Sequence, residues 1–336
     1  MTSNAKWWYI LTEVVIAVAC CLGNVLVIWA VWTRGALRQP TFCFIASLAV
    51  ADFLVGCVVI PLSMLVDIRM KISVHGCLCM CCVLVVLQMA SVNFLLVIAI
   101  DRYLRVRIPL TYKSTVTQKR SWIAVVFCWL TAAVWGFIPM FGWHKYNSSD
   151  KSSSFECSFL SVISTSYLVN FIFFSSVLPP FAVMTFLYSY IFLTTRRHLR
   201  ANKGVANESS TYSKKEHRLA ATLALVLVLF AVCWLPLFVM HTVRYYGHNV
   251  EIPFIAIDIG VILSHGNSAV NPIVYAFKIP KIREACCKLW MRLFHGTEHQ
   301  PSKPNNAESS TYSHLDNSQS KISRNTKIAA AQESAL

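Results

Sequence analysis

Seven long apolar stretches limit what this chain can fold into. Each stretch is close to or longer than the roughly 18–20 residues that an α-helix needs to cross a lipid bilayer. The stretches are residues 7–31, 42–66, 78–100, 122–141, 167–194, 219–243 and 252–277. Charged residues make up 13% of the chain, about half of the ~25% that is usual in soluble domains. A chain of 336 residues cannot bury seven such helices in a soluble core. We therefore predict an all-α membrane protein, a bundle of seven transmembrane helices.

The distribution of Lys and Arg along the chain predicts the orientation of this bundle. Of the 30 Lys and Arg residues, 20 lie in the alternate segments 34–38, 102–120, 196–218 and 278–292. Positive residues are retained on the cytoplasmic side of a membrane, so we expect an extracellular N-terminus and a cytoplasmic C-terminus at the plasma membrane. The net charge of +15 then reflects topology and attraction to anionic membrane lipids, and we predict no binding to nucleic acid.

Four regions are predicted along the chain. Residues 1–6 form a short extracellular N-terminus, and residues 7–277 form the bundle. Residues 278–294 alternate apolar and basic side chains in the manner of an amphipathic helix on the inner leaflet. Residues 295–336 are rich in Ser, Asn and Gln, and we expect a disordered cytoplasmic tail. With so short an N-terminus, a ligand has to bind in the bundle or its outer loops.

Modification and partner binding are predicted at a few positions outside the spans. Asn147 begins an Asn-Ser-Ser glycosylation sequon on the predicted outer side. Cys286 and Cys287 lie in the amphipathic segment, where they are either palmitoylated or ordinary reduced thiols. The chain ends at Leu336 in a Ser-Ala-Leu sequence, a weak match to the ligands of PDZ domains.

Two of the 13 cysteines are distinguished by their position. Cys77 begins the third predicted span on its outer side, and Cys157 lies in the loop before the fifth span. The extracellular compartment is oxidising, so a disulfide between them is plausible. Cys79 is a nearby competitor that the sequence does not exclude.

Ionisable side chains inside a membrane are functional candidates because each costs roughly 2.5–3.5 kcal/mol at the bilayer centre. Asp52 lies within the second span, and polar residues on other spans are expected near it: Asn24, Ser91, Asn267, Ser268 and Asn271. A carboxylate among hydroxyl and amide oxygens suits a small hard cation, for which sodium is the abundant choice. The alternative interpretation is a protonated Asp52 that joins helices through hydrogen bonds.

A conformational switch is predicted from the prolines and from the charges at the inner ends of two spans. Proline interrupts five spans and permits kinks about which packed helices pivot: Pro61, Pro139, Pro180, Pro236 and Pro272. Arg102 ends the third span beside Asp101, and Glu216 begins the sixth span on the same side. An Arg102–Glu216 pair would hold the cytoplasmic face closed until the sixth span pivots.

Six motifs follow one another in order along the spans. They are GNV at 23–25, LAVAD at 48–52, DRY at 101–103, Trp129, CWLP at 233–236 and NPIVY at 271–275. Together they resemble the rhodopsin-like class of G-protein-coupled receptors over residues 7–294. The resemblance implies a switch and G-protein face that contains Asp101, Arg102, Tyr103, Tyr188, Glu216 and Tyr275, with arrestin and receptor kinases as further partners.

Two ligand types of this class are excluded by single residues. Opsins carry a Schiff-base lysine where this chain has His265, and receptors for amines carry an aspartate where it has Leu84. The predicted pocket walls are apolar and aromatic: Leu84, Val85, Leu168, Trp234, Leu237, Phe238 and Val261. Such a surface suits a flat, neutral, heteroaromatic ligand.

Within the class, the chain is most similar to the adenosine receptors. The evidence is DRYLRV at 101–106, PMFGW at 139–143, CSF at 157–159 and SHGNSA at 264–269. The resemblance implies that Phe159 stacks on adenine, that Ser264 and His265 bind the ribose and that Glu13 pairs with His265. It also implies that Trp234 belongs to the activation switch and that an inhibitory G protein is the partner, as for subtypes one and three.

Two positions depart from the adenosine-receptor pattern. His241 stands where the family reads the adenine edge with an asparagine, and Gln88 replaces a threonine near the ribose. A neutral imidazole offers one donor and one acceptor with a different spread. The alternative is therefore a receptor for another purine or neutral heteroaromatic ligand. A transporter or channel is the less favoured hypothesis because no internal repeat is evident. No enzyme chemistry and no cofactor other than the sodium ion are expected.

Overall fold

The computed structural model describes residues 3–33, 39–145, 155–201, 208–247, 250–278 and 283–284. The chain divides into two compact units, Met1–Leu289 and Trp290–Leu336, and all described residues belong to the first. Asn147, Cys286, Cys287 and the predicted cytoplasmic tail lie outside the described residues, as does most of the predicted amphipathic helix.

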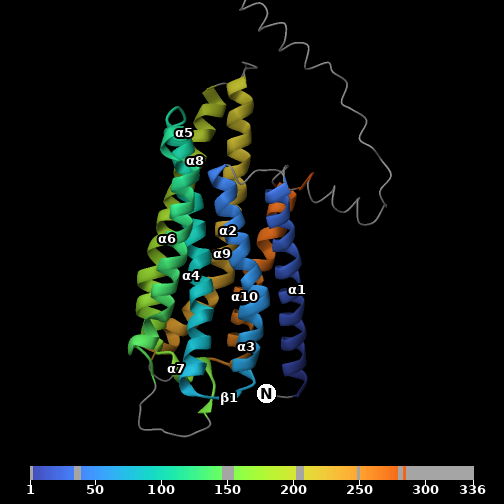
Figure 1. Ribbon diagram of the computed structural model, residues 1–336, viewed down its shortest axis with the longest axis vertical. Coiled ribbons are helices and arrows are strands. Elements are labelled where there is room, and N and C mark those ends of the chain that lie inside the picture. Colours follow the sequence, from blue (N-terminus) through green and yellow to red (C-terminus); the bar gives the residue numbers. More distant parts are fainter. Residues whose placement is uncertain are drawn as a thin grey trace, which may run out of the picture. The chain divides into compact units, whose positions relative to one another are not determined.

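The described residues of the first unit form seven helical columns that run side by side (Figure 1). They are α1 (Ser3–Thr33); α2 (Pro40–Leu54) continued by η2 (Val55–Val59) and α3 (Ile60–Asp67); α4 (Val74–Arg107); α6 (Gln118–Phe137) with η3 (Ile138–Phe141); η4 (Tyr167–Val177) with α8 (Leu178–Ala201); α9 (Glu208–Tyr246); and α10 (Phe254–Lys278). The predicted bundle of seven spans is thereby confirmed, and each predicted boundary is met within a few residues or overrun by the helix.

Among the described residues, six of these columns are long and apolar enough to cross a membrane by length and composition. The seventh, α10, is 25 residues long and is less apolar because polar side chains interrupt it, among them Asp258, His265, Asn267 and Asn271. The last three of these are buried. The polarity of α10 is therefore directed into the bundle, where a binding site needs it.

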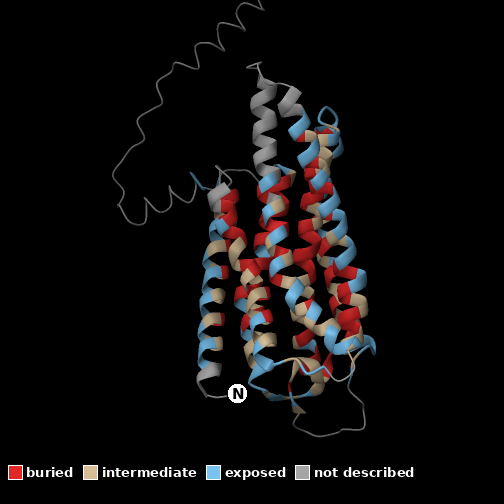
Figure 2. Cartoon of the chain, turned by 180° about the vertical axis from the view of Figure 1, so that it is seen from behind, coloured by how far each residue is buried: buried red, intermediate tan, exposed pale blue. Residues whose placement is uncertain are grey.

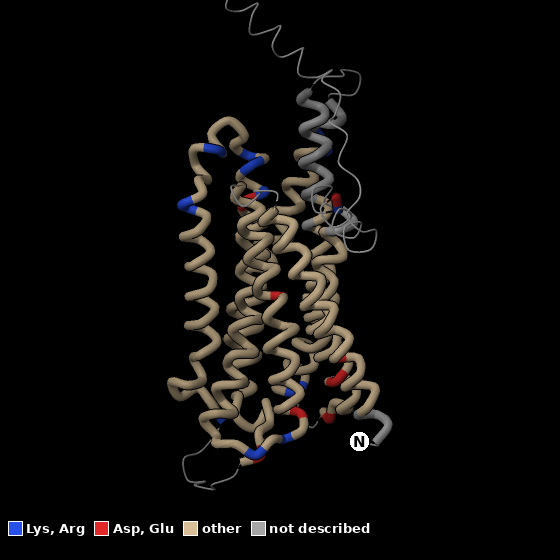
Figure 3. Tube along the Cα trace, turned by 45° about the vertical axis from the view of Figure 1, so that its right-hand side comes forward, with Lys and Arg blue, Asp and Glu red and all other residues tan. Residues whose placement is uncertain are grey.

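The third span, α4, is the centre of the bundle. It packs against α2, α6 and α8, while α1 packs against α2 and α10, and α9 packs against α8 and α10. Figure 2 shows buried positions on the inward faces and exposed positions on the outward faces of the helices. Figure 3 shows charged positions gathered toward the ends of the bundle. This pattern, apolar outside and charged at the ends, is the one a bilayer imposes.

Close helix contacts in the bundle depend on two glycines. A Cβ atom at Gly136 of α6 would lie 2.4 Å from Cγ2 of Val86 and 2.8 Å from its backbone nitrogen. A Cβ atom at Gly56 in η2 would lie 2.8 Å from the carbonyl oxygen of Ala17. Since helices in lipid associate through close packing and not through a hydrophobic driving force, these glycines set how near α6 and η2 come to their neighbours.

π-Helical segments accompany two of the predicted proline kinks. Pro61 follows η2, and Pro180 follows η4, in which 11 residues are wound as a π-helix. Pro139 lies in η3, whereas Pro236 and Pro272 lie inside the long helices α9 and α10. The sequence predicted the interruptions but not the change of helix type that accompanies them.

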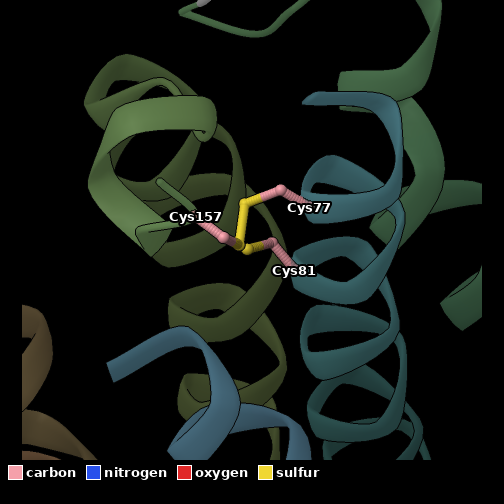
Figure 4. Close-up of side chains that lie close together, drawn as sticks. All are labelled: Cys77, Cys81 and Cys157. Carbon is pink, nitrogen blue, oxygen red and sulfur yellow. A yellow bond between two sulfur atoms is a disulfide. The ribbon is translucent and has the colours of Figure 1, made fainter. Parts of the chain in front are cut away.

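A disulfide joins the first turn of α4 to the loop in front of the fifth span. It connects Cys77 and Cys157, the predicted pair, whereas the competitor Cys79 is exposed and free. Next to it, β1 (Lys71–Ile72) pairs antiparallel with β2 (Phe155–Glu156). Cys81 lies one helical turn below Cys77, and Figure 4 shows its sulfur beside the bridge; the three Sγ atoms lie within 4.8 Å of one another. The loop is thus fastened over the bundle just before α7 (Phe159–Val162).

Candidate ligand-binding cavity

A cavity of about 810 Å³ lies in the bundle, next to the loop that carries the disulfide. It is lined by residues of α1, η2, α3, α4, α9 and α10, together with the start of α7. Its size falls within the range of about 300–1,000 Å³ for small-molecule sites. The disulfide holds one wall of this cavity, because Cys157 precedes the lining residues Ser158, Phe159 and Leu160.

Most of the predicted ligand residues are brought together around this one cavity. The lining contains Leu84, Val85, Gln88, Phe159, Trp234, Leu237, His241, Val261, Ser264 and His265. Apolar side chains and an aromatic ring therefore face a few convergent polar groups, which is the usual composition of a site for a small organic ligand.

Leu168 and Phe238 were predicted in the pocket wall, but the structure places them in the bundle core. Leu168 is buried in η4 and Phe238 is buried in α9, and neither lines the cavity. Leu168 is the second residue of η4, whose π-helical winding was not predicted from the sequence. Phe238 instead stacks on Phe173, with ring centroids 4.8 Å apart.

His265 is held from behind by a buried carboxylate. Its Nδ1 lies 2.8 Å from Oε2 of Glu13, which is fully buried and does not itself line the cavity. The neighbouring Ser264 donates a hydrogen bond to the carbonyl oxygen of Val261 at 2.7 Å. Glu13 thus orients from α1 an imidazole that itself lines the cavity.

Aromatic rings continue below the cavity toward the core. Trp234 lines the cavity, and its ring centroid lies 5.8 Å from that of Phe238 and 6.2 Å from that of Phe230. Phe238 in turn stacks on Phe173 of η4. A ligand that displaces Trp234 would therefore press on a column of rings that links α9 to η4.

Among the cavity residues that were not predicted from the sequence are Tyr9, Asp67 and Asp258. These three line the outer part of the cavity, and the hydroxyl of Tyr9 donates to Oδ2 of Asp67 at 2.8 Å. Asp258 lies inside the predicted seventh span, so the rule that flags ionisable residues in a membrane would have found it. Asp67 lies just outside the predicted second span, where the rule for ionisable residues in a membrane does not apply.

A second polar site surrounds Asp52, which is fully buried. Its Oδ1 accepts hydrogen bonds from Ser268 at 2.8 Å and from Ser91 at 3.4 Å, and its Oδ2 accepts one from Asn271 at 2.7 Å. Asn24 donates to the carbonyl oxygen of Ser268 at 3.1 Å instead of contacting Asp52. These contacts join the second, third and seventh spans.

Acceptor oxygens without donors mark the region around Asp52. Within the described residues, the side-chain oxygens of Asn24, Asn267 and Asn271 are buried and have no hydrogen-bond partner. Orphaned buried acceptors are uncommon, and oxygen atoms are the ligands of a small hard cation. The predicted residues Asp52, Ser91, Asn267 and Asn271 therefore offer a set of oxygen ligands that fits a sodium ion.

Near the C-terminal end of α4, Asp101 is the centre of a hydrogen-bond network. Oδ2 of Asp101 lies 2.6 Å from NH2 of Arg102, and both residues are buried. Thr41 donates to Oδ2 and Tyr112 donates to Oδ1, each at 2.5 Å. Burial, together with the nearby Asp101 carboxylate, raises the pKa of Tyr112 to about 12, so its hydroxyl remains protonated and donates at physiological pH.

Thr41 and Tyr112 were missed in the sequence because neither belongs to a motif. Tyr112 lies in α5 (Tyr112–Thr115), a short helix of the loop between the third and fourth spans. The side chain of the predicted partner Glu216 lies outside the described residues, so the proposed lock with Arg102 stays a prediction. Tyr188 and Tyr275 are both buried.

Comparisons with known proteins agree with the architecture. The family model "7 transmembrane receptor (rhodopsin family)" matches residues 23–275. Adenosine receptor A3 of Bos taurus is 43% identical over 284 residues, 84% of this chain and 89% of the relative. The receptors of the same name from Ovis aries and Canis lupus familiaris are each 41% identical, over 290 and 279 residues. These alignments cover 84% and 82% of this chain, and 91% and 88% of the two relatives.

Proposed function

This chain belongs to the rhodopsin family of seven-transmembrane receptors and, within it, to the adenosine receptors, and from that premise we propose that it detects extracellular adenosine and activates a heterotrimeric G protein of the inhibitory class. It is thus a multi-pass membrane receptor and not an enzyme. The observation that carries the ligand proposal is the cavity in which Phe159, Ser264 and His265 meet.

The chemistry of the cavity supports a nucleoside as the ligand. Ser264 and His265 on α10 offer hydroxyl and imidazole groups to the ribose, and Glu13 fixes the imidazole from behind. Phe159 and Leu237, which both line the cavity, suit a flat base, since stacking on an aromatic ring adds about 0.5–1.5 kcal/mol to the burial of area. Gln88 on α4 supplies a further amide that donates or accepts.

Signal transfer is proposed to run from Trp234 to the inner end of the bundle. A nucleoside in the cavity contacts Trp234, and α9 then pivots about Pro236, which lies two residues further along the helix. Movement of α9 away from Arg102 opens the face on which the G protein binds. A ligand shifts such an equilibrium only by its difference in affinity for the two states, so contact with the moving helix is required.

The proposed topology places the N-terminus outside the cell and the basic loops in the cytoplasm, at the plasma membrane. The excess of Lys and Arg on one set of loops supports this orientation. Arrestin and receptor kinases are proposed partners of the same inner face. A PDZ protein is a weaker candidate because it rests on the last three residues alone.

Adenosine at micromolar concentration is expected to stimulate nucleotide exchange on an inhibitory G protein when both are reconstituted in lipid nanodiscs. In cells, the same ligand should lower cyclic AMP. Ser264→Ala should reduce adenosine potency by about five- to tenfold, because a lost neutral hydrogen bond is worth about 1 kcal/mol. Ser161→Ala, a serine outside the cavity, serves as the matched control. Absence of exchange with every G-protein class would overturn the proposal.

Sodium is proposed to bind beside Asp52, and its binding is expected to raise the thermal stability of the ligand-free receptor. A ligand at about 100 times its Kd stabilises the folded state by about 2.7 kcal/mol. The measurement compares unfolding temperatures in sodium chloride and in choline chloride at equal ionic strength. Asp52→Asn should abolish the difference, whereas Asp258→Asn should retain it. Equal unfolding temperatures in both salts for the unchanged receptor would contradict a sodium site.

A further inference from the structure

His241 is the outermost of the residues through which α9 lines the cavity. The other two are Trp234, whose indole lies at the base of the cavity, and Leu237, whose side chain is a hydrocarbon. An aromatic ligand that turns its polar edge toward the outer part of α9 therefore meets the imidazole of His241. The hydrogen-bonding groups of this imidazole therefore decide which polar edge of a ligand is accepted there.

The two ring nitrogens of His241 differ in their surroundings. Nδ1 is enclosed by protein and has no hydrogen-bond partner among the described residues. Nε2 is not enclosed in this way, and His241 lines the cavity. The nitrogen available to a ligand is therefore Nε2.

The burial of Nδ1 determines where the proton of the neutral ring resides. An orphaned buried N–H group is rarer than an orphaned acceptor, and an unsatisfied buried donor costs about 1–3 kcal/mol. The neutral ring therefore carries its proton on Nε2 and leaves the lone pair of Nδ1 unpaired. A protonated ring also has an N–H at Nε2. In both states, His241 presents a hydrogen-bond donor to the cavity.

A donor at this place distinguishes two kinds of purine. The edge of a 6-aminopurine presents a donor, the N6 amine, beside the acceptor N7, and an amide side chain pairs with both. The edge of a 6-oxopurine presents two acceptors, O6 and N7, and suits a side chain that only donates. A 6-aminopurine accepts this hydrogen bond at N7 only and leaves its N6 amine without an acceptor on His241, unless the proton moves to the enclosed Nδ1.

We propose that His241 makes this receptor respond to 6-oxopurine nucleosides at least as well as to adenosine. The proposal rests on the proposed function, in that a purine nucleoside occupies the cavity with its ribose on Ser264 and His265. It concerns one residue, since Phe159 and Leu237 contact the faces of a purine and do not distinguish O6 from N6.

The test compares adenosine with inosine, which differs from it at position 6 of the purine, on the full-length receptor in nanodiscs with an inhibitory G protein. Inosine should stimulate nucleotide exchange at an equal or lower concentration than adenosine. His241→Asn should shift the ratio of the two potencies toward adenosine by about tenfold or more, the equivalent of about 1.4 kcal/mol. His241→Gln, which retains an amide, is the second variant should His241→Asn fold poorly.

His144→Asn is the matched control for this experiment. His144 also has an enclosed Nδ1 without a partner among the described residues, yet it does not line the cavity. Its substitution should leave the potency ratio unchanged. A receptor that prefers adenosine by more than tenfold, with the same ratio in His241→Asn, would overturn the inference and leave the proposed function intact. Failure of both nucleosides to stimulate exchange would overturn the proposed function itself.

Discussion

Replacing Cys157 by serine is expected to abolish high-affinity ligand binding and to lower the free energy of unfolding of the outer half of the bundle. The disulfide to Cys77 closes a loop with a sequence separation of 80 residues, and loss of such a bond removes about 2–4 kcal/mol. The bond also holds the segment that carries Phe159 across the cavity. Ligand binding to membranes and thermal unfolding of the purified receptor measure the two effects separately.

Cys79→Ser is the matched control for this substitution. Cys79 lies two residues from Cys77 on the same helix, and it is free and exposed, so its loss should change neither binding nor stability. Cys77→Ser combined with Cys157→Ser should resemble either single substitution, because the two cysteines act as one bond. Undiminished ligand binding by the Cys157→Ser receptor would show that the loop keeps its place without the bridge.

The fold could be predicted from the sequence because the membrane restricts it so strongly. Every backbone polar group in the hydrocarbon must be satisfied within its own segment, so an apolar stretch of about 20 residues has to be a helix. The structure accordingly has α1 at Ser3–Thr33 and α4 at Val74–Arg107, where residues 7–31 and 78–100 were predicted. The polar face of α10 shows where this reasoning is weakest, since a span that lines a site loses hydropathy.

Details of helix winding could not be predicted in the same way. Pro180 signals a break, but the structure has 11 residues of π-helix in front of it, and the buried Leu168 lies in this segment. Several rings of this segment pack against one another or against α9, Tyr167 and Phe173 among them. The hydropathy of the sequence predicts neither this winding nor the packing of the rings.

The candidate site was predicted in large part through family resemblance and less through the residues alone. A buried histidine is usually a satisfied core residue, and nothing in the spacing of Glu13 and His265 pairs them. Tyr9 and Asp67 were missed because they belong to no motif, whereas Asp258 could have been found as an ionisable residue inside a predicted span. Contacts between residues 58 positions apart, such as Tyr9 with Asp67, exist only once the bundle is assembled.

The carboxylate of Glu13 is expected to stabilise the fold and to position His265, and the two roles can be separated by substitution. Glu13→Leu leaves Nδ1 of His265 without the partner that it contacts at 2.8 Å. Removal of one member of a buried pair costs about 3–5 kcal/mol, so the unfolding temperature of the ligand-free receptor should fall markedly. Glu13→Gln, which keeps an acceptor oxygen, should be affected less.

A double substitution distinguishes stability from binding. Replacement of both members of a buried pair by apolar groups of similar size is often neutral for stability. The receptor with Glu13→Leu and His265→Phe should therefore regain most of the unfolding temperature that Glu13→Leu loses, whereas its adenosine response should stay lost because no imidazole remains beside Ser264. A double variant as unstable as the sum of the single variants would show that the two residues contribute independently. Recovery of the adenosine response together with stability would show that His265 supports the bundle and does not bind the ribose.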